Sequence, residues 1–152
     1  MKVKQSMLFL GTISNKVDAK GRVSVPADFR AAARGDEFQG VVLYHSFVQE
    51  CIEGCTMDRL EKLSDATDGL DVFGNEAQNL NFLIFSDARQ LAFDVTGRIV
   101  LPADLLEFAG ISGEALFVGK GKTFQIWNEA KFRKAQEEER KRAIASRPSL
   151  KL

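Results

Sequence analysis

Residues 18–28 are Asp18-Ala19-Lys20-Gly21-Arg22-Val23-Ser24-Val25-Pro26-Ala27-Asp28, and the pattern returns at residues 94–104 as Asp94-Val95-Thr96-Gly97-Arg98-Ile99-Val100-Leu101-Pro102-Ala103-Asp104. The shared skeleton is D-x-x-G-R-[VI]-x-[VL]-P-A-D, and the second copy lies 76 residues after the first. A unit that recurs at this length indicates an internal duplication, which decides the architecture of the whole chain.

Each copy of the skeleton predicts a tight turn between two strands. Asp at the first position and Gly at the fourth fit a type I turn, in which the Gly is free to take a positive φ. The flanking residues favour strands, so each copy predicts a β-hairpin with an arginine, Arg22 or Arg98, just past its tip. Proline cannot donate to a strand ladder and therefore ends the second strand. The turn and structural residues are Asp18, Gly21 and Pro26 in the first copy and Asp94, Gly97 and Pro102 in the second.

The fold class that follows is α+β, with each half forming strand, strand, short helix, strand, strand and helix. The first half is predicted to form strands at 8–17, 22–25, 38–46 and 50–54 and helices at 27–34 and 56–64. The second is predicted to form strands at 88–94, 98–101, 115–119 and 123–127 and helices at 103–109 and from 129 to about 145. Thr56 and Asn128 are the predicted caps of the two longer helices.

The repeat extends beyond the motif itself. Val41-Val42 resembles Phe117-Val118, and residues 51–60 align with residues 123–132 at an offset of 72. This alignment predicts about four extra residues between the last two strands of the first half. A segment rich in Asp, Gly and Asn, residues 65–78, is the predicted linker between the halves, and residues 76–85 are expected to be helical.

Charge is distributed unevenly along a chain whose net charge is zero. Residues 1–34 carry seven Lys and Arg against two Asp, whereas residues 35–87 carry two Lys and Arg against eleven Asp and Glu. A basic N-terminal third permits nucleic-acid binding that the total charge conceals. Apolar runs are far shorter than the roughly 18–20 residues of a membrane span, so we expect a cytoplasmic protein without a membrane partner. Residues 1–6 form a polar extension, and either Met1 or Met7 is a plausible start.

Catalytic and metal-binding motifs are not evident. Cys51 and Cys55 form a lone C-x3-C pair with His45 nearby, which is too few ligands for a structural metal site and predicts two structural cysteines. Neither a nucleophile elbow nor a phosphate-binding loop occurs. We therefore expect no enzymatic activity, no cofactor, no metal and no small-molecule substrate.

At D-A-K-G-R-V-S-V-P and D-V-T-G-R-I-V-L-P the sequence resembles the MraZ family, and the resemblance covers roughly residues 7–145. It implies a pseudo-duplicated, AbrB-like swapped-hairpin β-barrel made of two SpoVT/AbrB-like repeats. The expected division is an N-terminal extension and start of the first strand (1–11), repeat 1 (12–59), a helix and acidic linker (60–87), repeat 2 (88–131) and a C-terminal helix and tail (132–152).

The resemblance also implies a function. Members are DNA-binding transcriptional regulators, associated with repression at the promoter of the bacterial division and cell-wall gene cluster. They bind short direct repeats there as ring-shaped homo-oligomers, in the cytoplasm and on the nucleoid. The arginine of the motif is the family's DNA-contacting residue, which maps onto Arg22 and, in the second copy, Arg98.

Several alternatives stay open at this level. Arg22 can contact a phosphate or a guanine, or it can simply pair with Asp18 across the turn. Lys16 and Lys20 are flanking DNA-binding candidates or solvated lysines, and the second copy has Thr96 in place of Lys20. A further pair, Arg30 and Arg34, is expected to face solvent or a neighbouring subunit. As a whole, the chain is either a DNA-binding regulator or a protein-binding, antitoxin-like or scaffold module.

Overall fold

The computed structural model describes residues 8–35, 37–68 and 75–147. Residues 1–7, with the alternative starts, residues 69–74 of the linker and the tail after residue 147 lie outside the described residues. The described strands are β1 (Thr12–Lys16), β2 (Arg22–Ser24), β3 (Gly40–His45), β4 (Ile52–Cys55), β5 (Arg89–Ala92), β6 (Arg98–Val100), β7 (Glu114–Gly119) and β8 (Phe124–Trp127). The described helices are α1 (Ala27–Ala32), α2 (Met57–Asp68), α3 (Asn75–Asp87), α4 (Ala103–Ala109) and α5 (Glu129–Ser146).

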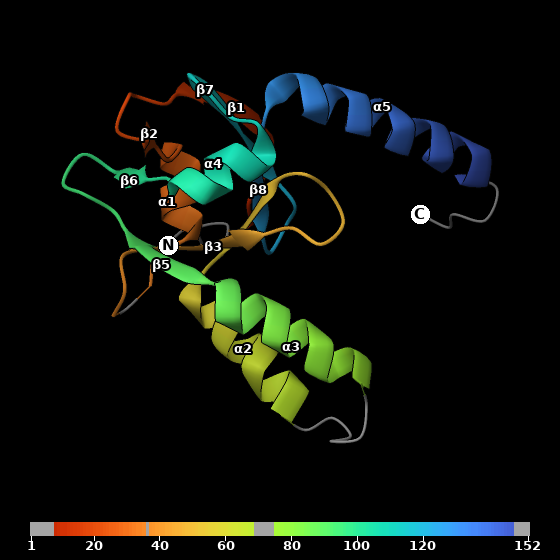
Figure 1. Ribbon diagram of the computed structural model, residues 1–152, viewed down its shortest axis with the longest axis horizontal. Coiled ribbons are helices and arrows are strands. Elements are labelled where there is room, and N and C mark those ends of the chain that lie inside the picture. The colour runs from red at the N-terminus through yellow and green to blue at the C-terminus, as the bar shows by residue number, and fades with distance from the viewer. Residues whose placement is uncertain (1–7, 36, 69–74, 148–152) are drawn as a thin grey trace, which may run out of the picture.

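The strands of the two halves are interleaved (Figure 1). A six-stranded antiparallel sheet has the order β1-β7-β8-β4-β3-β5, so each half's first strand pairs with the other half's third, and β2 and β6 form a separate two-stranded ribbon. The turns of the predicted hairpins are present, but the predicted pairing of the two strands that flank each turn is wrong. Of the first hairpin, the isolated Val17–Val23 bridge and the bond from the Asp18 amide to the Arg22 carbonyl at 3.0 Å remain. The swapped arrangement implied by the family resemblance is confirmed.

A pseudo-twofold axis relates the halves. It passes between Val23 and Ile99 at the centre of the β2–β6 pair and between Glu53 and Gln125 at the centre of the β4–β8 pair. The repeat offset is 76 residues at the first pair and 72 at the second. For β3 and β7 the offset is 74. Gly40, which pairs with Ala92, corresponds to Glu114, which pairs with Lys16.

The alignment of Val41-Val42 with Phe117-Val118 is consequently wrong by two residues. Val41 instead matches Ala115, and both are fully buried. The four extra residues of the first half are split, two before β3 and two between β3 and β4, instead of all lying between its last strands. Both insertions fall in connections, where they leave the strand register intact.

Aromatic side chains fill the space between the sheet and helix α1. Phe9, Phe29, Phe117 and Phe124 are each at most 1% exposed, and their neighbouring ring centroids lie 4.9–6.3 Å apart. Offset and edge-to-face arrangements at this spacing stabilise a core beyond the area they bury. The β2–β6 ribbon and the two short helices are thereby fixed to a rigid base.

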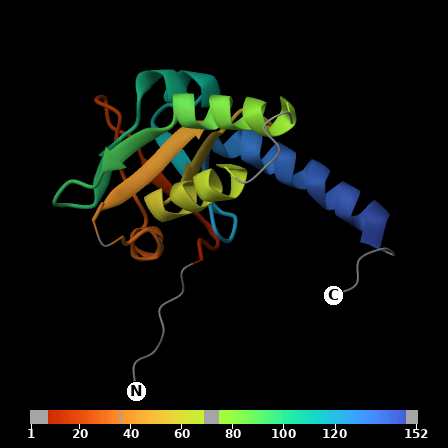
Figure 2. The same ribbon diagram turned by 90° about the horizontal axis from the view of Figure 1, so that it is seen from below.

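The longer helices lie outside this core. Figures 1 and 2 show α2 and α3 side by side, projecting away from the turns, and α5 extending from the sheet as a separate arm. The predicted caps are confirmed: Thr56 Oγ1 accepts a bond from the Arg59 amide at 3.0 Å, and Asn128 Oδ1 accepts one from the Lys131 amide at 3.1 Å. The predicted linker at 65–78 is helical at both ends, where α2 and α3 extend into it. No helix in the described part of the chain is long and apolar enough to cross a membrane.

Candidate nucleic-acid interface

The first turn is held by a single carboxylate. Asp18 Oδ1 accepts bonds from the backbone amides of Lys20 and Arg22, both at 2.9 Å, and the Asp18 carbonyl accepts one from Gly21 at 3.0 Å. Gly21 has a φ of +83°, which a residue with a Cβ adopts only with strain. The Arg22 amide is the main cause of a lowered pKa for Asp18, so this carboxylate stays ionised and its bonds stay charge-assisted.

The second turn repeats this geometry with one addition. Asp94 Oδ1 accepts bonds from the Thr96 and Arg98 amides, both at 2.9 Å, and also from the Thr96 hydroxyl at 2.8 Å. Gly97 has a φ of +80°. The Arg98 amide and then the Thr96 hydroxyl hold the pKa of Asp94 well below its usual range. Thr96 therefore reinforces the turn where the first copy places a lysine.

The side chain of each motif arginine is hydrogen-bonded to its aspartate through Nε, in addition to the bond from its backbone amide. Arg22 Nε lies 2.6 Å from Asp18 Oδ2, and Arg98 Nε lies 3.0 Å from Asp94 Oδ2. Both arginine side chains are more than a third exposed. Guanidinium has five N–H donors in a planar fork. The pair with aspartate therefore fixes the plane of the fork and leaves its terminal amino groups for a ligand.

The two arginines share one face of the β2–β6 ribbon. In this pair Arg22 lies opposite Val100 and Ser24 opposite Arg98, and these four side chains are exposed or half-exposed. Val23 and Ile99, on the other face, are buried in the core. Arg22 and Arg98 are thus diagonal neighbours across the ribbon, a relation that corresponds to a Cα separation of about 7–8 Å.

Each turn is braced by the other half of the chain. The Val25 amide donates to the Gly97 carbonyl at 3.1 Å, and its equivalent, the Leu101 amide, donates to the Gly21 carbonyl at 2.8 Å. These reciprocal bonds lock the two turns to each other. The prolines follow at once, as the N-cap residues of α1 and α4.

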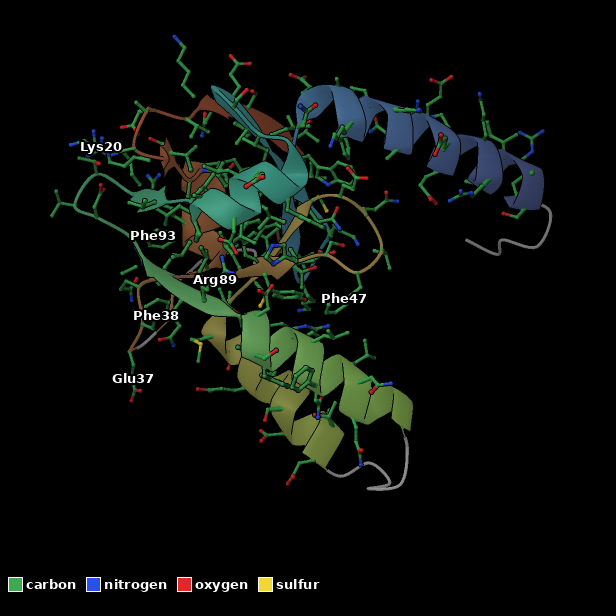
Figure 3. The ribbon with its side chains drawn as sticks, in the orientation of Figure 1. Lys20, Glu37, Phe38, Phe47, Arg89 and Phe93 are labelled. Carbon is green, nitrogen blue, oxygen red and sulfur yellow. The ribbon has the colours of Figure 1, made fainter. Side chains whose placement is uncertain are left out.

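The flanking lysines differ in their surroundings. Lys20 is exposed at the tip of the first turn (Figure 3). Lys16 is exposed at the end of β1 but lies opposite Glu114 in the β1–β7 pair, which places a carboxylate beside it. Lys20 is therefore the better placed of the two for a polyanion.

A protein-family model described as "MraZ protein, putative antitoxin-like" matches residues 8–80 and 84–149. The chain belongs to the MraZ family. Among curated MraZ-family relatives, the "Transcriptional regulator MraZ" of Rhodospirillum rubrum is 52% identical over 122 residues, which cover 79% of each chain. The protein of that name from Pelagibacter ubique is 46% identical over 144 residues, 95% of this chain and 93% of its own.

The sequence did not predict where Arg30 and Arg34 lie. The swap places α1, which follows the first turn in the chain, beside the second turn, so that both arginines line a groove with Asp94, Val95 and Gly97. Arg30 is half-buried and donates to the Val25 carbonyl, whereas Arg34 is exposed. Only the swapped pairing implied by the family resemblance could have indicated this proximity.

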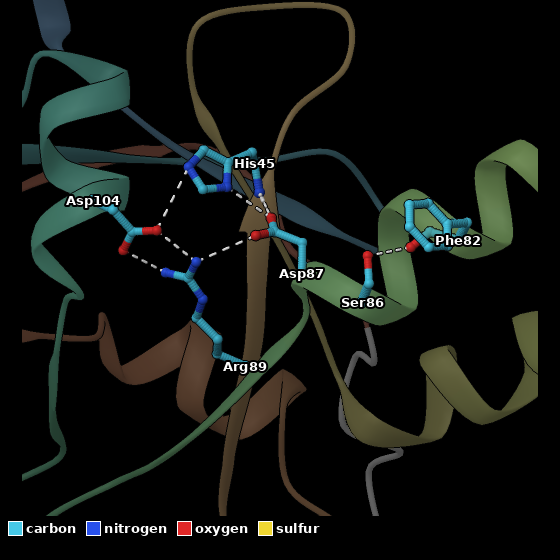
Figure 4. A network of polar contacts seen from close by, with 6 residues as sticks. All are labelled: His45, Phe82, Ser86, Asp87, Arg89 and Asp104. Atoms are coloured by element: carbon cyan, nitrogen blue, oxygen red, sulfur yellow. Dashed lines mark hydrogen bonds and ion pairs between the residues drawn. The ribbon is translucent and has the colours of Figure 1, made fainter.

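A polar cluster around His45 also escaped the sequence analysis (Figure 4). His45 Nδ1 and its backbone amide lie 2.7 and 2.6 Å from Asp87 Oδ2, and Arg89 makes two bonds to Asp104 at 2.6 and 2.5 Å. Burial disfavours charge on Asp87, but the bonds from His45 and the nearby Arg89 outweigh it and lower the pKa of the carboxyl. The cluster joins β3, the end of α3, β5 and α4 through hydrogen bonds and ion pairs, so it acts as a structural clamp.

The cysteines are free and buried, as predicted for structural residues. Burial raises the pKa of Cys51 to about 12 and that of Cys55 to about 11, which leaves both thiols protonated and unreactive at neutral pH. Within the described residues, no group of three or more His, Cys, Asp or Glu side chains could hold a metal ion.

Proposed function

We propose that this protein is a DNA-binding transcriptional regulator that contacts DNA through the β2–β6 ribbon and its two turns. The observation that carries the proposal is the placement of Arg22 and Arg98 on one exposed face, each with a fixed and available guanidinium fork. Membership in a family whose curated relatives are named transcriptional regulators supports it and speaks for regulation instead of catalysis.

The dimensions of the ribbon suit duplex DNA. The major groove of B-DNA admits a two-stranded β-ribbon, and an arginine there can bond bidentately to guanine. The diagonal separation of about 7–8 Å between the arginine Cα atoms spans roughly two base-pair steps of about 3.4 Å each. Lys20, at the first turn, would add a phosphate contact at the edge of the groove.

A single ribbon offers few contacts, so we propose that the protein acts as a ring-shaped homo-oligomer. Affinity for DNA rises with the number of phosphates neutralised. A ring that repeats the ribbon would engage several operator repeats at high effective concentration. The proposed targets are direct repeats in the promoter of the bacterial division and cell-wall gene cluster, with repression as the outcome and the nucleoid as the site of action.

The test is a gel shift on the promoter region upstream of the protein's own gene, with a scrambled duplex of the same composition as control. Light scattering on the same sample gives the mass in solution, which we expect to be a multiple of 16.9 kDa. Equal binding to both duplexes would refute sequence specificity, and a monomer at micromolar concentration would refute the ring.

A protein-binding, antitoxin-like role is the second candidate. It is favoured by the large apolar side chains that α3 exposes, Leu80, Phe82 and Leu83, and by α5, which buries none of its described residues. The two functions separate cleanly in one experiment. A regulator shifts duplex DNA as a purified protein, whereas an antitoxin-like module requires its protein partner for full binding.

A further inference from the structure

An open groove of about 420 Å³ lies between α1 and the second turn. Its lining consists of Ala27, Arg30, Ala31, Arg34 and Gln39 from the first half and of Phe93, Asp94, Val95 and Gly97 at the second turn. We call it the α1 groove. The skeleton motif does not include its arginines, and they come from the opposite half of the chain to the turn that they face.

Arg30 is a fixed cation at the back of the α1 groove. Its Nη1 donates to the carbonyl of Val25. The amide of the same residue donates to the Gly97 carbonyl and so braces the second turn. Its side chain also packs so closely on Gly97 that a Cβ built there would lie 2.8 Å from the guanidinium. Arg30 therefore supplies positive charge at a defined place but has little freedom to follow a ligand.

Arg34 is the exposed arginine of the groove. It lies two residues past the end of α1 and lines the same groove as Arg30. Its amide donates to the Ala31 carbonyl at 3.3 Å, which continues the helical path past the end of α1. The Arg34 side chain is exposed, so it can reach a ligand without disturbing the core.

The two turns differ in the basic residues around them, and the arginines of the α1 groove compensate for the lysine that the second turn lacks. At the repeat offset of 76 residues, Arg30 corresponds to Leu106 and Arg34 to Gly110. Leu106 packs behind the first turn, where its Cδ1 lies 3.8 Å from a Cβ built on Gly21. The first turn thus has Lys20 on its tip and an apolar residue behind it, whereas the second has Thr96 on its tip and two arginines behind it.

Asp94 is the one carboxylate among the described residues that line the groove, and its hydrogen bonds leave the arginine charge available. Asp94 has both oxygens engaged, Oδ1 by Thr96 and the Arg98 amide and Oδ2 by Arg98 Nε. Among the described residues that line the groove, two arginines therefore stand against one aspartate whose oxygens are already engaged. A phosphodiester, a compact anion with several acceptors, matches an arginine fork beside a fixed cation.

We propose that the α1 groove binds a phosphate of the DNA backbone beside the second turn, with Arg34 as its ligand and Arg30 as the fixed charge behind it. This inference rests on the proposed function. It assigns to the second turn a backbone contact that corresponds to the one expected from Lys20 at the first turn. Backbone contacts position a protein on the duplex without selecting its sequence.

The experiment compares Arg34→Gln, which removes the charge, and Arg34→Lys, which keeps it, with Arg140→Gln, which makes the same charge change at an exposed position on α5. Affinity for the promoter duplex and for the scrambled duplex is measured by fluorescence anisotropy across a salt series. Melting curves and light scattering establish that every variant keeps its fold and its mass.

We expect Arg34→Gln to weaken binding to both duplexes by the same factor. The slope of log affinity against log salt concentration should be shallower by about 0.9 for each phosphate that the variant no longer neutralises. Between roughly 50 and 200 mM salt, the loss of affinity should therefore be roughly 3.5-fold smaller for the variant than for the unmodified protein. Arg34→Lys should retain the slope, and Arg140→Gln should match the unmodified protein.

Three outcomes would overturn the inference. A slope for Arg34→Gln equal to that for Arg140→Gln would exclude the phosphate contact while leaving the proposed function in place. A loss confined to the promoter duplex would mean that Arg34 contacts bases and not the backbone. Failure of the unmodified protein to bind any duplex would refute the proposed function itself, and the groove assignment with it.

Discussion

Replacing Arg22 with Ala separates the DNA role of the motif arginine from its structural role. The side chain is 38% exposed, and within the described part of the chain it forms an ion pair with Asp18, which keeps its two backbone bonds in the variant. The turn should therefore persist, and the melting temperature and oligomer mass should be unchanged. An arginine needed mainly for folding would behave differently, because its removal would lower the melting temperature in parallel with binding.

The size of the binding loss identifies the contact. A bidentate bond to guanine contributes about 1–3 kcal/mol of discrimination, so Arg22→Ala would weaken promoter binding roughly 5- to 150-fold per contact and scrambled binding much less. A phosphate contact would weaken both equally and flatten the salt slope by about 0.9. Arg98→Ala should give a loss of similar size, since the pseudo-twofold axis makes Arg98 the equivalent of Arg22 and the α1 groove supplies the charge that Thr96 lacks.

Anisotropy titrations on the promoter and scrambled duplexes measure these losses, with Arg140→Ala as the control for a surface arginine. The sequence alone predicts a smaller effect for Arg98→Ala, because Thr96 leaves its turn with one basic residue fewer. Normal promoter binding by Arg22→Ala would refute the assignment of the ribbon as the DNA interface. So would a loss of binding that appears only together with unfolding.

Gly97→Ala should reduce the free energy of unfolding by about 1–2 kcal/mol in urea titrations, because φ is +80° there and a Cβ would collide with Arg30. An unchanged urea midpoint would contradict this backbone conformation and the packing of Arg30 on Gly97. A lowered pKa means that Asp87 stabilises the fold above the pKa of an unfolded Asp, about 3.9, and loses that contribution as the pH falls through the folded value. Asp87→Asn should therefore lower the urea midpoint at about pH 7, and the difference from the unmodified protein should shrink toward about pH 2; a difference independent of pH would argue against the clamp. Cys51 and Cys55 should resist iodoacetamide at about pH 8 in the folded protein and react in urea, since burial raises both pKa values; alkylation without unfolding would contradict their burial.

Local structure was largely predictable from the sequence because it depends on local chemistry. The Asp and Gly of the skeleton specify the turns, Asn128 caps α5, and α4 begins and ends at the predicted residues, 103 and 109. Gly110 takes the left-handed conformation that ends this helix. Each of these features needs only neighbouring residues, so a single sequence contains the required information.

Strand pairing was not predictable in the same way. Val23 lies between Arg22 and Ser24 and Ile99 between Arg98 and Val100, patterns that suit any antiparallel partner. Nothing local distinguishes β1 pairing with β2 from β1 pairing with β7. The offset errors have the same origin, since an apolar pair such as Val41-Val42 fits either register. The swapped arrangement is set by the shared core, to which both halves contribute aromatic rings.

The candidate site shows this limit most clearly. Sequence identified Arg22 and Arg98 but treated them as two separate tips, whereas the ribbon makes them diagonal neighbours on one face. The sequence likewise placed Arg34 at the end of a predicted helix and gave it no relation to the second turn. That relation arises only from the swapped strand pairing. Chemistry-bearing residues were identifiable one at a time, and their grouping required the topology.

The interleaved fold also removes the opposition between a structural and a DNA-binding role for the motif arginines. The aspartate that accepts the turn amides is the same group that holds Nε, so one carboxylate sets both the shape of the turn and the plane of the guanidinium. An arginine fixed in this way loses less conformational freedom on binding than a free surface arginine does. Because the two braced turns are locked together through Gly21 and Gly97, the two forks also keep a fixed distance from each other. The ion pair is therefore part of the proposed DNA-binding device, since it presents two arginines to the duplex in a geometry that the core already holds.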